Sequence, residues 1–402
     1  MLIAVVGGKL QGVEAVYLAQ KAGLKTLVID KNSDAPATGL CDLFLEYRFS
    51  PEHPVPKGCP KVDLILPAIE DTMVLMCLEL WSQMEDIPLA FDPDAYRISS
   101  SKIKSHALFR EMNLPSPLPW PQCSFPVVVK PDGESGSRGV EVFNDLKSLS
   151  ARFPNPQGMD SRVIQEYMEG PSFSIEVVGS PGHYQALQVT DLYMDEVYDC
   201  KRITAPTKLA PREISRFCKL ALDIASKIRL TGIMDVEVIL HKDELKLLEI
   251  DARLPSQTPM AVFWSSGINI VERLVYLFLG KKTFFPEPEQ VRYVMVEHIR
   301  VCGADIKVCG EHIMPQEGPL TVEPGFFGAN EAVTSYRPGK KQWVATLILA
   351  TDRKCPSRAA RSSRPAAGST TCLRSRCATT SPPSSAPAST TSTSISTTSW
   401  RA

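Results

Sequence analysis

The sequence has no apolar run long enough to cross a bilayer as a helix. The apolar stretch at residues 2–6 is also too short for a secretory signal, and it lacks the basic leader and small-residue cleavage site of one. The 11 cysteines are scattered singly, without a CxxC pair or a metal-ligand spacing. These absences exclude a membrane-spanning helix and a disulfide or zinc framework, and we expect a soluble, cytoplasmic protein with reduced thiols.

Acidic side chains are absent after Asp352, where Ser, Thr, Ala, Pro and Arg make up almost the whole sequence. Such a composition cannot bury enough apolar area to offset its ordering entropy, so we expect residues 354–402 to be disordered. The chain carries a formal charge of -1, and the seven positive charges of residues 354–402 therefore leave -8 on residues 1–353. This acidic body argues against a nucleic-acid partner.

A chain of 402 residues is too long for one ordinary domain, and the predicted elements divide it. Residues 1–90 have a βαβ pattern, with strands expected at 2–6, 26–30 and 62–66 and helices at 13–22 and 72–81. Residues 91–290 have helices expected at 102–112 and 213–228 and short strands at 127–130, 140–143, 163–167, 173–178, 233–239 and 245–250. Further strands in 291–353 complete the body. These patterns predict an α/β domain followed by an α+β arrangement.

The glycine turn at residues 7–12, Gly-Gly-Lys-Leu-Gln-Gly, resembles a phosphate-binding turn. It fits neither the dinucleotide fingerprint G-x-G-x-x-G nor the P-loop, which ends in Gly-Lys-Ser/Thr. Glycines that only tighten a strand-to-helix turn would look the same. Lys9 and Gln11 remain candidates for contacting a ligand at the start of the helix.

The strand at 127–130 delivers Lys130 beside a loop of glycines and hydroxyls at 131–139. Backbone amides of such a loop, together with Ser135 and Ser137, can close over phosphates while the lysine neutralises their charge. An ordinary mobile hairpin would look similar. The strand at 163–167 runs into a glycine turn and can present backbone groups to the edge of an adenine, although a plain core strand fits it as well.

Carboxylates share one face of two neighbouring strands. Alternation places Asp235 and Glu237 together on the first strand, and it places Glu249 and Asp251 together with Arg253 on the second. Residues 241–244 are a plausible hairpin turn between the strands. Four converging carboxylates repel one another unless a cation lies among them, and Mg²⁺ suits carboxylate oxygens and substrate phosphates. Arg253 is then placed for a phosphate or an acyl phosphate. A solvated sheet face is the alternative.

These residues, in this order, resemble the ATP-grasp ligases over most of residues 1–353. The motifs at 7–12, 94–99, 198–200, 232–237 and 249–259 are most similar to the branch that joins 3-methylornithine to lysine in pyrrolysine biosynthesis. The resemblance implies an ATP-grasp fold behind a Rossmann-like domain. It also implies a ligase that uses ATP and Mg²⁺ to form a carbon–nitrogen bond. Gln165 and Ser172 depart from the family pattern, which often has acids at these positions.

The resemblance assigns roles to individual residues. Arg253 and Lys130 would be catalytic. The ATP contacts would be Lys102, Lys130, Ser135, Ser137, Gln165, Glu166, Tyr167, Met168, Leu10, Gln11 and Asp30. The ornithine-like acid would face Ser174, Ile175, Glu176 and Asp235. Lysine or the nucleotide would contact Lys9, Glu70 and Asp71. The magnesium ligands would be Glu237, Glu249 and Asp251.

In this family the carboxylate attacks the γ-phosphate of ATP, and the lysine side-chain amine then displaces phosphate from the acyl phosphate. The expected partners are therefore small amino acids, and assembly into a homo-oligomer is left open. Two alternatives remain. One is an ATP-grasp ligase for other amino acids or a purine precursor, and the other is a non-catalytic nucleotide-binding module.

The resemblance stops near Arg353, where the family continues with an acidic helix and this chain continues with Lys-Cys-Pro-Ser-Arg. Our hypothesis is a shifted reading frame at this point. Translating the gene in its other two frames tests it, and we expect one of them to encode an amphipathic helix. If neither frame does, the hypothesis is wrong.

Overall fold

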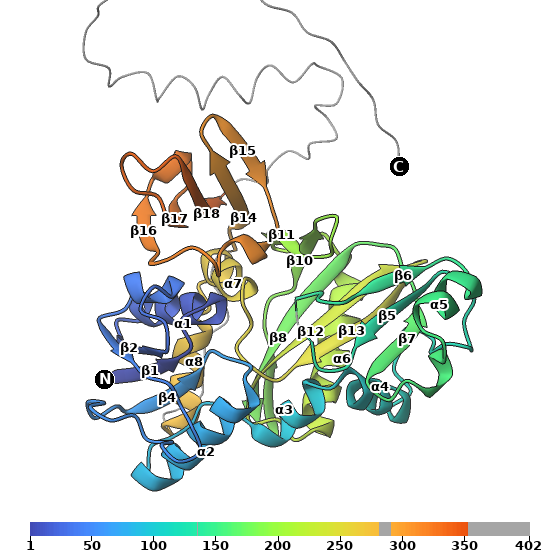
Figure 1. Ribbon diagram of the computed structural model, residues 1–402, viewed down its shortest axis with the longest axis horizontal. Helices are drawn as coiled ribbons and strands as arrows, with labels where there is room; N and C mark the ends of the chain where they lie inside the picture. Colours follow the sequence, from blue (N-terminus) through green and yellow to red (C-terminus); the bar gives the residue numbers. More distant parts are fainter. Residues whose placement is uncertain (135, 281–290, 353–402) are drawn as a thin grey trace, which may run out of the picture. The chain divides into compact units, whose positions relative to one another are not determined.

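The computed structural model describes residues 1–134, 136–280 and 291–352 (Figure 1). Its first sheet is wholly parallel, in the order β3-β2-β1-β4. The strands are β1 (Leu2–Val6), β2 (Lys25–Asp30), β3 (Leu43–Glu46) and β4 (Leu64–Pro67). Apolar runs form them because both faces of a parallel sheet are covered. The predicted βαβ opening is confirmed, and β3 is an additional strand.

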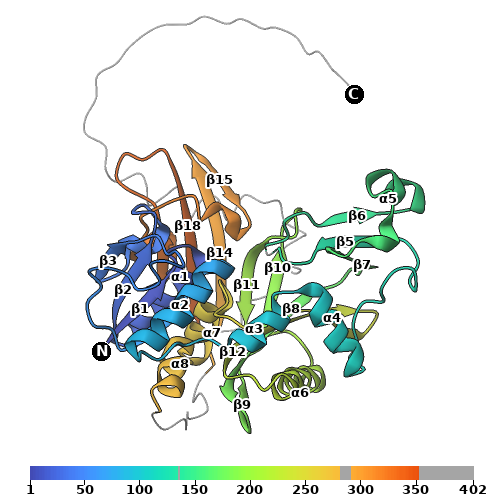
Figure 2. The ribbon, with the colours of Figure 1, turned by 60° about the horizontal axis from the view of Figure 1, so that its bottom comes forward.

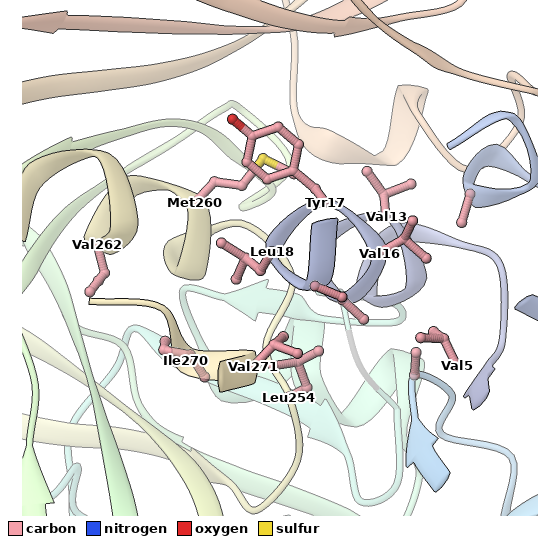
Figure 3. Packing of buried hydrophobic residues seen from close by; sticks show 14 of the residues in the cluster. Val5, Val13, Val16, Tyr17, Leu18, Leu254, Met260, Val262, Ile270 and Val271 are labelled. Atoms are coloured by element: carbon pink, nitrogen blue, oxygen red, sulfur yellow. The ribbon is translucent and has the colours of Figure 1, made fainter. Parts of the chain in front are cut away.

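Two helices cover this sheet on opposite faces. α2 (Thr72–Glu85) begins where Asp71 accepts a hydrogen bond from the Val74 amide at 3.1 Å, and its Trp81 packs with Ala4, Val6 and Ile29. On the other face, α1 (Leu10–Lys21) packs against two helices from much later in the chain, α7 (Thr258–Ser266) and α8 (Ile270–Phe278). Figure 3 shows this packing, in which Leu18 and Tyr17 of α1 lie near Ile270 and Met260.

A second, three-stranded sheet follows the first, in the order β6-β5-β7. Its strands are β5 (Val127–Pro131), β6 (Glu141–Phe143) and β7 (Arg162–Glu166), and α5 (Leu146–Arg152) packs beside β6. Two helices precede it, α3 (Pro93–Ser99) and α4 (Lys102–Glu111). Asp92 and Ser101 cap their first turns with side-chain oxygens, as residues of these types commonly do.

The third sheet has 11 strands, nine of them in the order β13-β12-β8-β10-β11-β14-β18-β17-β16. They are β8 (Ser172–Ser180), β9 (His183–Ala186), β10 (Thr190–Met194), β11 (Cys200–Ala205), β12 (Gly232–His241), β13 (Glu244–Asp251), β14 (Tyr293–Cys302), β15 (Asp305–Val308), β16 (Thr321–Pro324), β17 (Glu331–Thr334) and β18 (Gln342–Thr351). α6 (Pro211–Lys227) packs on β8 and β9. The sheet continues across the boundary expected at residue 290, because β11 pairs with β14 (Figure 2).

The hairpin expected at residues 241–244 is confirmed. Lys242 and Asp243 form its two-residue turn with φ of 50° and 63°, which is the left-handed geometry of a type I′ turn. The register that results sets Asp235 opposite Asp251 and Glu237 opposite Glu249. The turn alone would set Glu237 opposite Leu248, and the bulge between Glu237 and Val238 shifts the pairing by one residue, so the turn and the bulge together determine which carboxylates meet.

Short 3-10 turns complete the described part of the chain: η1 (Pro36–Gly39), η2 (Pro156–Gly158), η3 (Glu311–Ile313) and η4 (Phe326–Gly328). Among the described residues, no helix is both long and apolar enough to span a membrane. Residues 354–402, expected to be disordered, lie outside the described residues.

A buried histidine on β14 predicts sensitivity to acid. His298 is 3% exposed, its Nδ1 lies 2.9 Å from Thr346 Oγ1, and burial lowers its pKa to about 4. The unfolded chain, with a histidine pKa of about 6.5, binds the proton first, so stability is lost as the pH falls from 6.5 towards 4. When the pH falls from 6.5 to 5, we expect the unfolding free energy of the wild type to fall by about 2 kcal/mol more than that of His298→Gln. Urea denaturation at both pH values measures this, with exposed His53→Gln as control. Equal losses in wild type and His298→Gln would contradict it.

Candidate active site

A cavity of about 260 Å³ lies between the three-stranded sheet and the β12–β13 part of the large sheet. Its walls come from β5, β7, β12, β13, the loop at 132–139 and the segment that follows β13. Twelve of the residues predicted from the sequence line it: Lys102, Lys130, Ser137, Gln165, Glu166, Tyr167, Met168, Asp235, Glu237, Glu249, Asp251 and Arg253. Residues from five separate stretches of the chain thus meet in one place.

Two lysines face the carboxylates. Lys102 is the first residue of α4; its Nζ lies 2.9 Å from Glu249 Oε1 and donates to the Glu134 carbonyl at 2.7 Å. Lys130 stands on β5, where burial lowers its pKa although Glu249 opposes this effect. These two cations line the cavity together with Gly136, Ser137 and Arg138 of the glycine loop. This arrangement suits an anion with several charges, such as a polyphosphate.

The carboxylates are too close for all of them to ionise independently. Burial, reinforced by the neighbouring acids, raises the pKa of Glu237 well above its ordinary value. Burial also raises the pKa of Asp251 to about 7 and that of Asp235 to about 6. Burial alone would raise the pKa of Glu249 as well, but Lys102 and Lys130 lower it. Lys102 and Lys130 therefore do not fully neutralise the cluster, and an additional cation would stabilise its ionised form.

Glu237, Glu249 and Asp251 offer the oxygen donors that Mg²⁺ prefers, on directly facing strands. In this structure Glu249 turns to Lys102, and Asp251 Oδ2 lies 2.7 Å from Arg253 Nη2. Among the described residues, the set whose ligand atoms lie within 4.8 Å of one another is a different one, Asp195, Asp199 and His312. The carboxylate oxygens of Glu237, Glu249 and Asp251 are thus of the type that binds magnesium, while Glu249 and Asp251 form ion pairs with Lys102 and Arg253 in this structure.

The Asp195 set serves a turn between β10 and β11. Asp195 accepts hydrogen bonds from the amides of Val197, Asp199 and Gly310, and Asp199 accepts from the amide and Nδ1 of His312. Because these carboxylate oxygens already have donors, the cluster is explained as a clamp on this turn.

Arg253 connects the carboxylates with the first domain. Besides its ion pair with Asp251, its Nε lies 2.9 Å from Glu70 Oε1. The same Glu70 oxygen accepts a hydrogen bond from Gln11 Nε2 at 2.7 Å. Gln11 and Glu70, two of the predicted first-domain residues, are thus linked to the cavity through Arg253, although they do not line it.

The stretch expected to hold adenine, residues 165–168, also lines the cavity. Gln165 is 1% exposed, and its Oε1 has no hydrogen-bond partner. The Tyr167 hydroxyl lies 3.3 Å from that of Tyr198, and the Tyr198 carbonyl accepts a hydrogen bond from Ser137 Oγ at 2.8 Å. The glycine loop is therefore in contact with the turn at 195–199, so the cavity is bordered from both sides.

Several predicted residues lie outside the cavity lining. Ser174 and Glu176 are fully buried behind it, where Ser174 Oγ donates to Asp235 Oδ1, and Ile175 packs into the core on the opposite face of the sheet. Asp30 accepts from the Gly8 amide at 2.7 Å, and Asp71 caps α2. Leu10 packs against the core, and Lys9 is exposed at the start of α1. Ser135 lies outside the described residues.

The sequence patterns did not indicate Glu311. It lines the cavity from η3, its Oε1 accepts a hydrogen bond from Ser256 Oγ at 3.3 Å, and burial raises its pKa to about 8. Residues 311–313 form only a short turn, so neither periodicity nor spacing could indicate this position. Only the path of the chain brings it to the segment after β13.

Comparison with known proteins gives a family. The ATP-grasp domain family matches residues 99–257. The 3-methyl-D-ornithine–L-lysine ligase of Methanosarcina mazei is 38% identical over 331 residues, which cover 80% of this chain and 85% of that protein. The chain belongs to the 3-methyl-D-ornithine–L-lysine ligase family. The ligase of Methanosarcina barkeri is likewise 38% identical, over 87% of its length. Membership confirms the resemblance and the carbon–nitrogen ligase class predicted from the sequence.

Solved structures confirm the ATP-grasp fold. The ADP complex of an N5-carboxyaminoimidazole ribonucleotide synthetase superposes with a TM-score of 0.65 at 14% identity, covering 88% of this chain and 93% of that one. The biotin carboxylase domain of the Hydrogenobacter thermophilus 2-oxoglutarate carboxylase, in complex with MgADP and bicarbonate, gives 0.66 at 16% identity, with 87% and 86% covered. At these identities the likeness concerns the fold alone.

The lysine at the start of α4 allows a binding test. If Lys102 contacts phosphates, Lys102→Ala should weaken ATP binding by about tenfold to a hundredfold, the usual loss for a charge-assisted hydrogen bond. Lys104→Ala is the control, since Lys104 lies on the same helix, is exposed and donates to the Arg97 carbonyl. Isothermal titration calorimetry with a non-hydrolysable ATP analogue measures both. An equal loss in the two variants would argue against a specific role for Lys102.

Proposed function

We propose that this protein is an ATP- and Mg²⁺-dependent ligase that activates the carboxylate of 3-methyl-D-ornithine and joins it to the side-chain amine of L-lysine. Family membership supports the substrates, since the relatives bear that name at 38% identity. The observation that carries the reaction type is one cavity in which Lys102, Lys130 and Arg253 face the carboxylates of β12 and β13. Such a site neutralises phosphate charge and can hold a metal.

The first step joins the acid's carboxylate oxygen to the γ-phosphorus of ATP, and the bond to the ADP oxygen breaks. Lys102 and Lys130 are placed to neutralise the phosphate oxygens, and Arg253 is placed for the oxygens of the acyl phosphate. Glu237, Glu249 and Asp251 would hold Mg²⁺, which supplies further charge neutralisation when bound. To bind Mg²⁺, Glu249 and Asp251 would have to coordinate the metal in addition to, or in place of, their present ion pairs with Lys102 and Arg253.

The second step forms the amide. The uncharged lysine amine attacks the acyl carbon, the bond to phosphate breaks, and the proton that the amine loses leaves with the phosphate as hydrogen phosphate. Water would compete with the amine for the acyl phosphate, so the cavity must be closed at this stage. The contact between Ser137 of the glycine loop and the Tyr198 carbonyl supports a role for this loop in closure.

An ornithine-like acid carries ammonium groups, and buried carboxylates suit them. Both Glu176 carboxylate oxygens are buried without a hydrogen-bond partner, and burial raises the Glu176 pKa to about 8. The buried Thr258 hydroxyl lies beside Glu176 and opposes this rise in pKa, although it makes no hydrogen bond of normal geometry, and Asp235 is the cross-strand neighbour of Glu176. An unpaired buried acid is costly, and an ammonium group would relieve that cost. This supports Glu176 and Asp235 as the site of the acid's amines.

An ADP-release assay tests the proposal. Wild type should release ADP with Mg²⁺ when an ornithine-type acid and lysine are both present. Glu249→Ala should lower the rate by at least about a hundredfold, because it removes an acid that faces the phosphate site. Glu244→Ala is the control: Glu244 begins the same strand, forms an ion pair with Lys246 and lies outside the cavity lining.

The outcomes separate the alternatives. Release of ADP with other amino acids or a purine precursor, and not with lysine and ornithine, would replace the proposed substrates. ATP binding without any turnover would leave a non-catalytic nucleotide-binding module and reject the proposed reaction.

A further inference from the structure

The first turn of α7 lies at the cavity and lacks a cap of its own. Ser256, Gln257 and Thr258 line the cavity, and Gln257 is the residue before the helix. Gln257 has φ of 107°, which a residue with a side chain rarely adopts, and its side chain makes no capping hydrogen bond. The first amides of a helix have no partner within it. Something else must satisfy them here.

Glu14 of α1 satisfies two of these amides. Its Oε1 accepts from the Gln257 amide at 3.0 Å, and its Oε2 accepts from the Met260 amide at 3.1 Å. In a capping box two residues of the same helix divide this work between them. Here a single carboxylate, 5% exposed and 243 residues away in sequence, does both. Burial raises the pKa of Glu14 to about 8, and the hydrogen bonds from the Gln257 and Met260 amides oppose this effect.

A second contact from α1 reaches the same stretch of chain. Gln11 and Glu14 are three residues apart and therefore lie on one face of the helix. Gln11 donates a hydrogen bond to Glu70, which forms an ion pair with Arg253. Glu14 accepts hydrogen bonds from the amides of residues 257 and 260. The apolar contacts of α1 with Met260 fix the distance between these elements (Figure 3). One face of α1 thus holds both ends of the segment from 253 to 260.

We propose that Glu14 is a positioning residue for the amino-acid end of this site. Through its two hydrogen bonds it holds Gln257 in its unfavourable backbone conformation and so sets the wall formed by Ser256, Gln257 and Thr258. The inference rests on the proposed function, because it concerns how the same cavity receives its amino acids. ATP lies toward Lys102 and Lys130 in that proposal, so nucleotide binding does not depend on Glu14.

Glu14→Gln tests this role. An amide side chain keeps the shape of Glu14 and offers one acceptor oxygen in place of two. We expect the KM for at least one amino acid to rise about tenfold while the KM for ATP stays within about twofold, because a displaced wall affects positioning. Glu331→Gln is the matched control, since Glu331 also holds α1, through Tyr17 and Lys21, and lies outside the cavity lining.

Hydrogen exchange gives a readout without turnover. The Gln257 and Met260 amides should exchange faster in Glu14→Gln than in wild type and in Glu331→Gln, and melting temperatures show whether each variant is folded. If Glu14→Gln does not fold, Glu14→Asp, which is one methylene shorter, takes its place in both measurements.

The outcomes keep the two proposals apart. Inactive wild type rejects the proposed function, and the exchange experiment still tests the capping. Active wild type with unchanged amino-acid KM in Glu14→Gln overturns the inference. An equal rise in KM for ATP, or the same rise in Glu331→Gln, overturns it as well, because either result shows general loosening.

Discussion

The charge balance across β12 and β13 is the constraint on which the site depends. The register of the hairpin sets two pairs of acids opposite each other, and their repulsion under burial has to be offset. Lys102 comes from α4, Lys130 from β5 and Arg253 from the segment that follows β13, so the acids are balanced only when these elements are assembled around them. The same requirement makes the assembled cavity suitable for a metal and for phosphates. Both the folded structure and the proposed chemistry thus require cations close to the carboxylates of β12 and β13.

The sequence predicted the site well where its information is local. Alternation along two strands and a plausible turn predicted that Asp235, Glu237, Glu249 and Asp251 share one face, and the register bears this out. The bulge between Glu237 and Val238, which this pairing requires, was not indicated by any local pattern. The lysine strand and the glycine loop were also found from composition and order. Which residues contact ligands remains a prediction, since a fold alone does not decide it.

How deeply a side chain is buried, and which residues distant in sequence it contacts, could not be predicted. The period of a strand gives the face of Ser174 and Glu176, but it does not show that both are fully buried, with Asp235 against Ser174 and Thr258 of α7 beside Glu176. Glu14 and Glu311 meet the segment after β13 only because helices and turns from distant parts of the chain pack there. In the first domain, the glycine turn made Gln11 a candidate for a ligand contact, which stays a prediction, but did not indicate its hydrogen bond to Glu70. Such partners are set by tertiary packing, which no local pattern records.

The last strand has a consequence for the unusual end of the chain. β18 pairs along its whole length with β14, from Gln342 opposite Cys302 to Thr351 opposite Tyr293, and it also pairs with β17. Asp352 then pairs with Arg292 at 3.2 Å. The change in composition follows directly after this point. Within residues 1–352, β18 keeps its full pairing with β14 up to Thr351, so a frame change after this point would leave these strand pairings encoded as they are.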